Sequence, residues 1–404
     1  MQSGKRILIL GAGFGGLAAA NLLRGNLEPE HRITVIDKKK SFMMGLVNLW
    51  VLHGDRILED SATPLDGLTS KGIEFLNDEI VEIDARSRSV LTKGRGKLES
   101  DYMIIALGAE LDPERVPGFV GKGFNLYDSQ QIPALRSRLL SARRGEKVAV
   151  AIMGIPYKCP PAPYEASMLI SDLLLQNGKR DGIEIDIYAP TPVPIPVAGP
   201  QANKDMVDML QKQGINFHPL HKVKSVQDDM LVFEDGRSAS YDILAGVPAH
   251  KVPDVVSRSG IAPEGGWVPA DPFTLKTAYE RVFAIGDIAG LQPSGYAMAV
   301  PKAGIFAEGQ GKAVALQIIH EIKLQMGNRS SSKQSQQNAE GLARFDGKGY
   351  CFFEVGNNMA SYIEVDFYNK AGPAVVLHPP SASSYRKKRE FENDRVREWL
   401  AANK

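Results

Sequence analysis

Residues 6–16 read RILILGAGFGG, in which a short apolar run is followed directly by a segment of six residues, 11–16, that contains four glycines. The run is typical of a buried strand, and the pattern that follows it, Gly16–Arg24, is helical. A second apolar run at Ile33–Ile36 completes a strand, helix and strand, and such a unit implies a parallel sheet. We interpret the first run as a strand and not as a signal peptide, because glycines interrupt it and no cleavage site follows.

The glycine cluster has the spacing of a dinucleotide-binding turn. Gly11 permits the tight turn, Gly13 lets the backbone approach a pyrophosphate, and Gly16 lets the helix pack closely on the strand. Asp37 lies 21 residues after Gly16, at the end of the second strand, where a carboxylate can bind a ribose hydroxyl. Together with the neighbouring Lys38, these residues predict a nucleotide site.

The alternation of strands and helices begins again at Lys147. We expect a strand at Lys147–Met153, a helix near 164–177 and a strand at Ile183–Ala189, which together make a second unit of the same kind. The other expected elements are antiparallel strands within 72–92 and 98–107, strands near 223–234 and 241–246, a strand at Arg281–Ala284 and a helix near 301–326. The predicted fold class is α/β, with two Rossmann-like dinucleotide-binding units and a small C-terminal α+β module.

The C-terminal module is predicted from the last part of the sequence. Strands at Tyr350–Val355 and Ala360–Tyr368 flank a Gly-Asn-Asn turn signal. A helix is expected from about Ser384 to Ala402, with a basic start and an apolar stripe formed by Phe391, Val396, Trp399 and Leu400. Such a helix either docks on its own protein or lies in a membrane interface, and the pattern leaves both alternatives open.

Composition excludes several classes of protein. The 404 residues include 48 basic and 47 acidic side chains, a balance that argues against a nucleic-acid-coating protein. Two cysteines are too few for a disulfide framework or a multi-ligand zinc or iron–sulfur site, so we expect no metal. No apolar run approaches the roughly 20 residues that span a bilayer.

The turn after the strand Lys147–Met153 departs from a nucleotide site. Residues 153–165 read MGIPYKCPPAPYE, with prolines and Tyr157 where glycines would let a pyrophosphate approach. A proline has no N–H group to donate to phosphate. We therefore expect that nicotinamide is not the electron donor.

Two further segments resemble the flavin-contacting segments of flavoproteins with two dinucleotide-binding domains. They are IIALGA at 104–109 and VFAIGD at 282–287. The resemblance implies FAD as the cofactor and implies cofactor contacts from Ala106, Gly108, Gly286 and Asp287, with the aspartate bonding the ribityl chain. Lys302, near the start of the expected helix, could stabilise an anionic reduced flavin together with that helix N-terminus.

The sequence as a whole resembles the sulfide:quinone oxidoreductases and the flavoprotein subunit of flavocytochrome c sulfide dehydrogenase. The resemblance rests on KCPPAPYE at 158–165, GYCFFEVG at 349–356 and HGDR at 53–56, besides the flavin segments. It implies that Cys159 and Cys351 meet over the flavin and cycle between oxidised and thiolate forms. It also implies that Glu165 is a proton acceptor or donor, although an ordinary carboxylate in the first turn of a helix would look the same.

Thiol chemistry is consistent with this role without the resemblance. A sulfide anion can attack one sulfur of an oxidised pair, and the thiolate that is released can pass two electrons to a flavin. A nearby cation would favour the thiolate form. The sequence does not say which cysteine adjoins the flavin, although we favour Cys351.

Two positions differ from the family pattern. Many of the quinone reductases have a third cysteine upstream of the Cys159 motif, and this chain has none. The flavocytochrome subunits usually attach FAD through a cysteine in the segment that aligns with Phe42–Leu46, where this chain has Gly45. We therefore expect non-covalent FAD, and the differences leave open both the sulfur product and the electron acceptor.

These expectations divide the chain into five parts. They are 1–111, the first part of the FAD-binding domain; 112–269, the second Rossmann-like domain with Cys159; 270–326, the second part of the FAD-binding domain; 327–341, a polar flexible linker; and 342–404, the C-terminal module with Cys351 and the amphipathic helix.

The predicted function is FAD-dependent oxidation of sulfide, or of a related thiol or persulfide, with electrons passed to a membrane quinone. The expected location is cytoplasmic, peripheral at the inner face of the cell membrane, with no nucleic-acid partner and a possible homo-oligomer. Phe352 and Phe353 would line a quinone pocket or belong to the core. The alternatives are a flavoprotein that delivers electrons to a cytochrome, an NADH:quinone oxidoreductase of the same fold, and a non-catalytic flavin-binding interaction protein.

Overall fold

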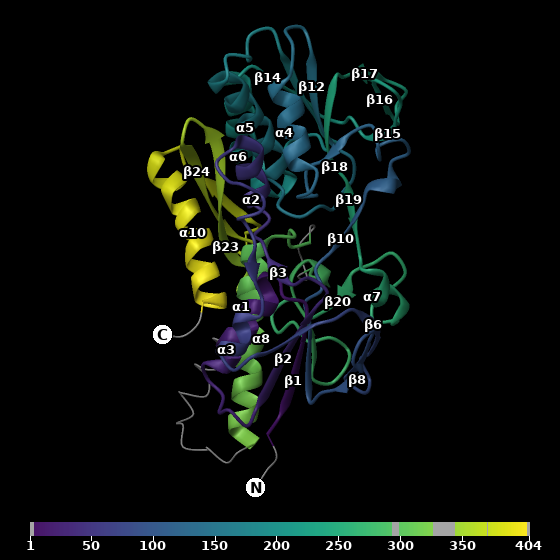
Figure 1. Ribbon diagram of the computed structural model, residues 1–404, viewed down its shortest axis with the longest axis vertical. Helices are drawn as coiled ribbons and strands as arrows, with labels where there is room; N and C mark the ends of the chain where they lie inside the picture. Colours follow the sequence, from purple (N-terminus) through teal and green to yellow (C-terminus); the bar gives the residue numbers. More distant parts are fainter. Residues whose placement is uncertain (1–3, 293–298, 326–343, 370, 402–404) are drawn as a thin grey trace.

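The computed structural model describes residues 4–292, 299–325, 344–369 and 371–401. Figure 1 shows two α/β bodies stacked along the long axis, with the C-terminal module lying along one side of both. The predicted linker 327–341 and the end of the predicted C-terminal helix at Ala402 lie outside the described residues.

The lower body in Figure 1 is built on a five-stranded parallel sheet in the order β21-β9-β1-β2-β5. Its strands are β1 (Arg6–Leu10), β2 (Arg32–Asp37), β5 (Glu74–Asn77), β9 (Tyr102–Ile105) and β21 (Val282–Ala284). The prediction of antiparallel pairing was wrong for β5 and β9. Both join the parallel sheet, β9 as a fully buried apolar strand and β5 at the edge. Among the strands between residues 72 and 107, the antiparallel sheet is formed by β6 (Ile80–Asp84), β7 (Ser89–Thr92) and β8 (Gly96–Glu99).

Helices α1 (Phe14–Arg24) and α8 (Gly304–Gln325) pack against each other in this body. Gly311 allows this close approach, since a Cβ atom there would lie 2.3 Å from the carbonyl oxygen of Gly15. The helix predicted near 301–326 is thus confirmed, with its start at Gly304.

The upper body repeats the arrangement with a parallel sheet in the order β11-β18-β12-β13-β14. Its strands are β11 (Phe124–Asn125), β12 (Lys147–Ile152), β13 (Glu184–Tyr188), β14 (Ile215–His218) and β18 (Ile243–Val247), and its helices are α4 (Ile132–Leu140), α5 (Ala162–Gln176) and α6 (Gly199–Lys212). An antiparallel sheet of β15 (Val223–Val226), β16 (Met230–Phe233) and β17 (Ser238–Ser240) lies at its side. The second dinucleotide-binding unit is therefore present as predicted.

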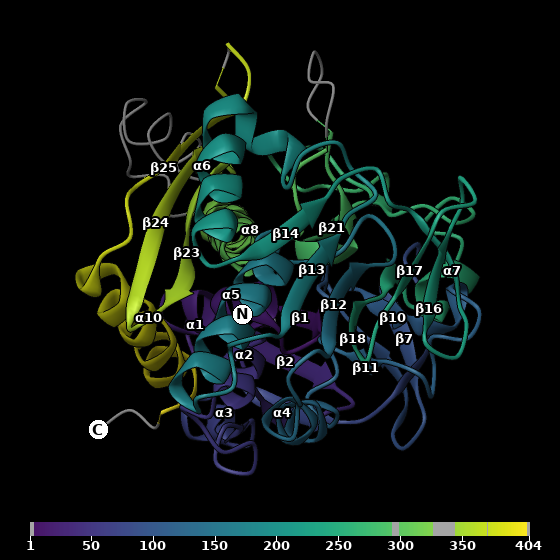
Figure 2. The ribbon, with the colours of Figure 1, turned by 90° about the horizontal axis from the view of Figure 1, so that it is seen from above.

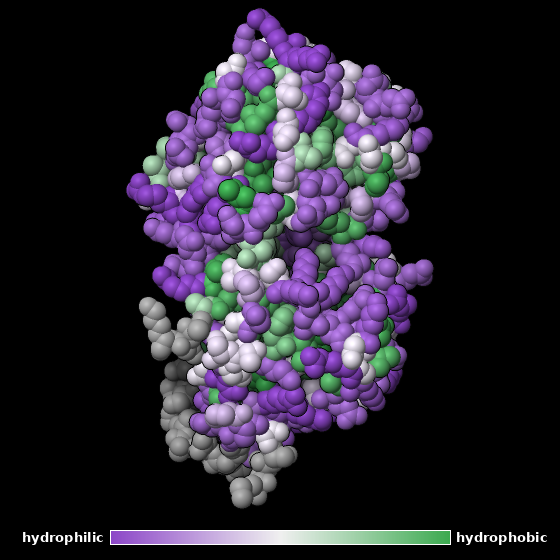
Figure 3. Space-filling model, in the orientation of Figure 1, coloured by the Kyte–Doolittle hydropathy of each residue, from purple (hydrophilic) through white to green (hydrophobic). Residues whose placement is uncertain are grey.

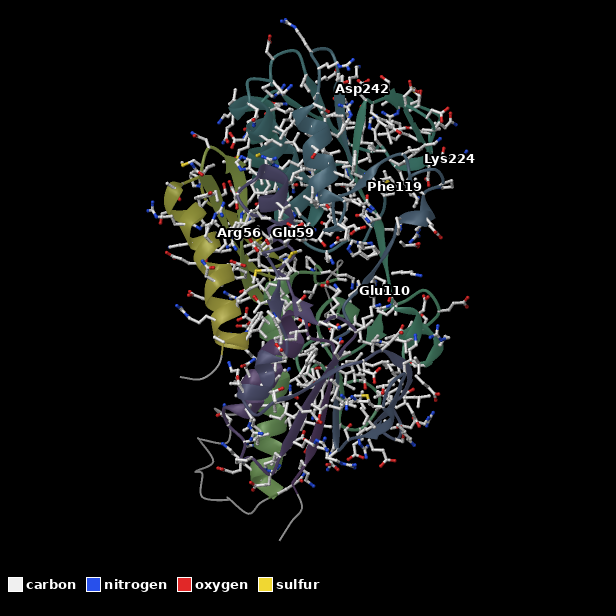
Figure 4. The ribbon with its side chains drawn as sticks, viewed as in Figure 1. Arg56, Glu59, Glu110, Phe119, Lys224 and Asp242 are labelled. Atoms are coloured by element: carbon white, nitrogen blue, oxygen red, sulfur yellow. The ribbon has the colours of Figure 1, made fainter. Side chains whose placement is uncertain are left out.

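The two bodies are joined by β10 (Glu110–Asp112), which pairs antiparallel with β19 (Ala249–Lys251). Glu110, labelled in Figure 4, lies on this connection and pairs with Lys38 at 3.5 Å. The remaining short elements are the paired strands β3 (Ser41–Phe42) and β4 (Thr63–Pro64), the paired strands β20 (Val268–Pro269) and β22 (Ala289–Gly290), the helices α2 (Val47–His53), α3 (Gly67–Ser70) and α7 (Asp254–Arg258), and the 3₁₀ turns η1 (Pro113–Arg115), η2 (Pro196–Ala198) and η3 (Gly286–Ile288).

The C-terminal module is an antiparallel sheet covered by a helix (Figure 2). Its elements are β23 (Lys348–Gly356), β24 (Met359–Asp366), β25 (Ala374–Leu377) and α10 (Ala382–Leu400), of which β25 was not predicted. The predicted turn between the first two strands is confirmed, since Gly356, Asn357 and Asn358 all have positive φ angles.

Helix α10 packs its apolar stripe on its own protein. Trp399 is completely buried and its ring lies 5.4 Å from that of Phe14 and 5.9 Å from that of Phe42. An indole that is enclosed in this way cannot sit at the level of lipid headgroups, so the docking alternative is the one that the structure supports. No helix in the described ranges is long and apolar enough to cross a bilayer.

Candidate active site

The predicted cofactor residues meet at one edge of the lower sheet. Gly11 follows β1, Asp37 ends β2, Ala106 follows β9 and Gly286 follows β21, and these four strands are neighbours. Ligands of open α/β sheets bind outside the carboxyl ends of the strands, and these four residues lie at or just after the carboxyl ends of their strands. Residues that are far apart in the sequence therefore form one continuous lining.

The glycine-rich turn has the shape that a pyrophosphate requires. Gly11 has a φ of +107°, and a Cβ atom at Gly16 would lie 2.0 Å from the carbonyl oxygen of Gly11. A Cβ atom at Gly13 would meet nothing within 4 Å, so Gly13 borders open space at the start of α1. Asp37 braces the turn, because its carboxylate accepts a hydrogen bond from the backbone N–H of Ala12 at 2.8 Å. The residues present thus fit a bound dinucleotide.

The two predicted flavin segments complete this lining. Gly108 and Gly286 have φ angles of +68° and +75°, and the N–H of Gly286 donates to Gln310 at 2.6 Å. Burial raises the pKa of Asp287, and the positive charges of Lys158 and Lys302 oppose that rise. Lys38 differs from the other predicted residues, since its side chain is exposed and pairs with Glu110.

Lys302 connects the flavin segment to the sulfur-bearing loop. It is 8% exposed, and its ammonium group donates to the carbonyl of Asp287 and lies 3.3 Å from the centre of the Trp267 ring. Its own carbonyl accepts a hydrogen bond from the N–H of Cys159 at 2.7 Å. Burial lowers the pKa of Lys302 to about 8. It is a buried cation two residues before α8 and not a solvated lysine.

Cys159 and Cys351 are brought together from the upper body and the C-terminal module. Cys159 has a φ of +54°, which is uncommon for a residue with a side chain, and its hydrogen bond to Lys302 holds that conformation. The two side chains are hydrogen-bonded to each other, which raises the pKa of Cys159, and burial raises it further. The same hydrogen bond lowers the pKa of Cys351. The two thiols therefore differ, with the pKa lowered at Cys351 and raised at Cys159, so Cys351 loses its proton more readily than Cys159.

A buried cluster of charges lies beside the two thiols. Glu165, in the first turn of α5, and Glu354, on β23, are each 2% exposed and share the ammonium group of Lys388 from α10. Lys388 lies 3.0 Å from Glu354, which also accepts from the indole of Trp50 at 2.7 Å. Burial raises the pKa of Glu165 to about 6, with Lys388 opposing and Glu354 adding to the rise. Although burial lowers the pKa of Lys388, its two carboxylate partners raise it more.

Lys388 and Glu354 were missed by the sequence analysis. Lys388 belongs to the basic run 386–389, which reads as a solvated surface, while Arg386 and Lys387 in that run are indeed exposed. Glu354 stands in the segment GYCFFEVG, three residues after Cys351, and that position was the available signal. Only the docking of α10 and β23 shows that both side chains are buried.

The phenylalanines that follow Cys351 belong to the core. Phe353 is fully buried, and Phe352 packs against the rings of Tyr350, Tyr362 and Phe391. The second of the two roles expected for them, core packing, is the one that their contacts support.

An apolar cavity of about 250 Å³ borders the loop that carries Cys159. Tyr157 and Pro160 of this loop line it together with Pro194, Trp267 and Lys302. Figure 3 shows that the face of the molecule seen in Figure 1 is mainly hydrophilic, so this lining differs in character from that surface. Within the described residues, no cluster of three or more His, Cys, Asp or Glu side chains is arranged to hold a metal ion.

The fold and the site define a flavin-dependent oxidoreductase with two dinucleotide-binding units. The chain belongs to the pyridine nucleotide-disulphide oxidoreductase family, whose model matches residues 5–154 and 166–308, and its cofactor is FAD. The central part of the sulfide dehydrogenase [flavocytochrome c] flavoprotein chain matches residues 133–185.

Several named proteins are similar to this chain. A sulfide-quinone reductase of Aquifex aeolicus is 28% identical over 79% of this chain and 77% of its own length. A mitochondrial sulfide:quinone oxidoreductase of Mus musculus is 26% identical over 73% and 68%, and a type II NADH:quinone oxidoreductase of Staphylococcus haemolyticus is 23% identical over 78% and 82%. The X-ray structure of the Aquifex aeolicus sulfide:quinone oxidoreductase superposes with a TM-score of 0.83, at 24% identity, covering 97% of this chain and 90% of the other, which shows the shared fold.

Proposed function

We propose that this protein oxidises sulfide, or a related thiol or persulfide, through Cys159 and Cys351 and passes the electrons by way of FAD to a membrane quinone. The observation that carries the proposal is the contact between two cysteines from distant segments, beside a buried carboxylate and next to the flavin edge of the lower sheet. The names of the sulfide-quinone reductases that match most of the chain support the substrate and the acceptor.

We infer the order of bond changes from the opposite directions in which the pKa values of the two thiols are shifted. In the oxidised pair, HS⁻ attacks the sulfur of Cys159; a new S–S bond forms there, the Cys159–Cys351 bond breaks, and Cys351 leaves as a thiolate. A thiol of lower pKa leaves faster, and Cys351 has the lowered pKa. Bound FAD supplies a two-electron acceptor for this chemistry.

Glu165 is the proposed proton acceptor for the incoming sulfide or thiol. With a pKa of about 6, it is mostly ionised at neutral pH and still basic enough to take a proton. Lys388 holds the carboxylate in place.

The cofactor is proposed to be bound without a covalent link. Gly45 stands where the flavocytochrome subunits have the attaching cysteine, and it offers no side-chain nucleophile. Gly11, Gly13, Gly16, Asp37, Ala106, Gly108, Gly286 and Asp287 are the proposed lining, with Lys302 as the buried cation near the flavin. Lys38 is proposed at the rim, where it pairs with Glu110.

Two alternatives have an observation in their favour. The match to the flavocytochrome c flavoprotein chain supports a cytochrome as the acceptor. The similarity to type II NADH:quinone oxidoreductases supports NADH as the donor, but the loop after β12 opposes it, because prolines fill the turn and the adjoining cavity is apolar. Peripheral attachment to the inner face of the cell membrane and assembly into a homo-oligomer remain part of the proposal.

The test is anaerobic mixing of the FAD-loaded protein with sulfide, and separately with NADH, while flavin absorbance is followed. We expect rapid bleaching by sulfide alone, slowed by roughly a thousandfold in Cys159→Ser and Cys351→Ser. Bleaching by NADH that both variants retain would replace the proposal with the NADH alternative. Absence of bleaching by either reductant would favour a non-catalytic flavin protein.

A further inference from the structure

Helix α5 and strand β23 are joined by two carboxylates. Glu165 accepts a hydrogen bond from the backbone N–H of Glu354 at 2.9 Å, and Asp172 accepts one from the backbone N–H of Asn357 at 3.0 Å. The helix begins three residues after Cys159, and the strand carries Cys351. Both bonds therefore connect the elements that carry the two sulfur atoms.

The two bonds hold β23 and the turn that follows it at two points. Glu165 and Asp172 are seven residues apart on α5, which corresponds to a rise of about 10.5 Å along the helix axis. Glu354 lies within β23, whereas Asn357 lies in the turn after it, where Gly356 and Asn357 have positive φ angles. Because each carboxylate accepts from one particular N–H group, a shift of β23 by one residue along α5 would move both N–H groups away from their acceptors.

The second of these carboxylates is held by His53, the last residue of α2, which packs on α4 and α5. His53 lies 3.0 Å from Asp172 through Nε2 and 3.0 Å from Asp55 through Nδ1, and the side chains of His53 and Asp172 are only 10% and 9% exposed. Strand β23 ends close by, since a Cβ atom at Gly356 would lie 2.8 Å from the Cβ atom of Asp172. His53 and Asp55 belong to the motif HGDR at 53–56, whose residues have no role in the proposed reaction.

We propose that Asp172 and His53 are positioning residues that, together with Glu165, set the register in which Cys351 meets Cys159. This inference rests on the proposed function in one respect, since it takes these cysteines as a redox pair. The other groups that face His53 are Arg389 of α10, which pairs with Asp55, and Arg136 of α4, which lies against Gly54. We call His53, Asp172 and Glu165 the clamp, because their hydrogen bonds join α2, α5 and the end of β23. Neither His53 nor Asp172 has a hydrogen bond to a cysteine among those found in the described residues.

The test measures the Cys159–Cys351 disulfide in the FAD-loaded full-length protein. In buffers of reduced and oxidised glutathione, two protein thiols and one oxidised glutathione give one protein disulfide and two reduced glutathione molecules. Alkylation and mass measurement give the fraction oxidised. We expect the equilibrium constant for disulfide formation to fall about tenfold in Asp172→Ala, which removes the acceptor of a charge-assisted bond. Asp172→Asn keeps an acceptor oxygen for the N–H group of Asn357, so its equilibrium constant for disulfide formation should be close to that of the wild type.

Leu173→Ala is the matched control, because Leu173 is a neighbouring core residue of the same helix at 1% exposure. It should lower the melting temperature and leave the disulfide equilibrium unchanged. Equal equilibria in the wild type and Asp172→Ala, or an equal loss in Leu173→Ala, would overturn the clamp. No disulfide in the wild type would overturn both the redox pair and the clamp. A disulfide that Asp172→Ala weakens, in a protein whose flavin sulfide does not bleach, would overturn the proposed function and support the clamp.

Discussion

Strands β1 and β12 occupy the same place in the two bodies and end in opposite ways. Each is the third strand of a five-stranded parallel sheet. After β1, glycines leave open space at the start of α1. After β12, prolines and Tyr157 fill the turn, and the N–H of Cys159 is used to bind the carbonyl of Lys302. The same position in the fold thus offers a ligand site in both bodies, while the side chains decide which chemistry occupies it.

The largest expected effect comes from closing the glycine turn. In Gly16→Val, the new side chain would begin 2.0 Å from the carbonyl oxygen of Gly11, so α1 cannot pack on β1 and FAD binding should be lost. The ratio of flavin to protein absorbance after purification measures this. Gly13→Ala is the control for folding, since its Cβ atom meets nothing within 4 Å, and it should fold with weakened FAD binding. A Gly16→Val protein with full flavin content would contradict the assignment.

The next prediction concerns Lys388, the buried cation that pairs with Glu165 in the helix after the proline-rich turn. Lys388→Met leaves Glu165 and Glu354 buried without their cation, which should cost about 3–5 kcal/mol of unfolding free energy. Urea unfolding followed by circular dichroism measures the loss. Lys387→Met, at an exposed position of the same helix, should leave the stability unchanged. Equal stability of the two variants would show that the buried cluster is not held by Lys388.

A smaller effect is expected in the pH dependence of flavin reduction by sulfide. Burial raises the pKa of Glu165 to about 6, so the carboxylate is protonated below that pH and cannot accept a proton. The rate should rise as the pH increases through about 6, in addition to the rise that the ionisation of H₂S to HS⁻ produces in every variant. Glu165→Gln should reduce the rate about a hundredfold and abolish that step in the profile. If Glu165→Gln retained the step near pH 6, the step would have to arise from the titration of another group.

The smallest effect concerns the positioning histidine. Hydrogen bonds to Asp172 and Asp55 raise the pKa of His53 to about 9, above its ordinary value of 6.5. The stability that its charge supplies is therefore fully present below about pH 6.5 and is lost as the pH rises through about 9. We expect the melting temperature of the wild type to fall about 2 °C more than that of His53→Gln between pH 7 and 10. Parallel curves for the two proteins would show that His53 is not charged in the fold.

Much of the lower body follows from local pattern. The glycine spacing, the apolar strands and the terminal Asp37 specify a nucleotide turn within about 30 residues, and the structure has these elements where they were predicted. Strands β5 and β9 were assigned to the wrong sheet, because a run of only four residues, whether mixed as in β5 or apolar as in β9, has the same pattern in parallel and antiparallel pairing. Strand β25 was missed although its residues, AVVL, form a short apolar run between Pro373 and Pro379, which is a strand signal that the sequence analysis did not use.

The cofactor unit, the two segments that carry the cysteines and the proline turn that opposes a nucleotide in the upper body can all be recognised from local sequence patterns. The tertiary structure decided which charges stand beside the sulfur atoms. Arg56, labelled in Figure 4, pairs with Glu392 of α10 at 2.9 Å, and Lys388 of the same helix is buried between two carboxylates. A basic run has the same sequence whether it is solvated or buried, and only the docking of α10 removes Lys388 from water. The distance between Cys159 and Cys351 is likewise a property of the packing of α5 on β23, which no local pattern contains.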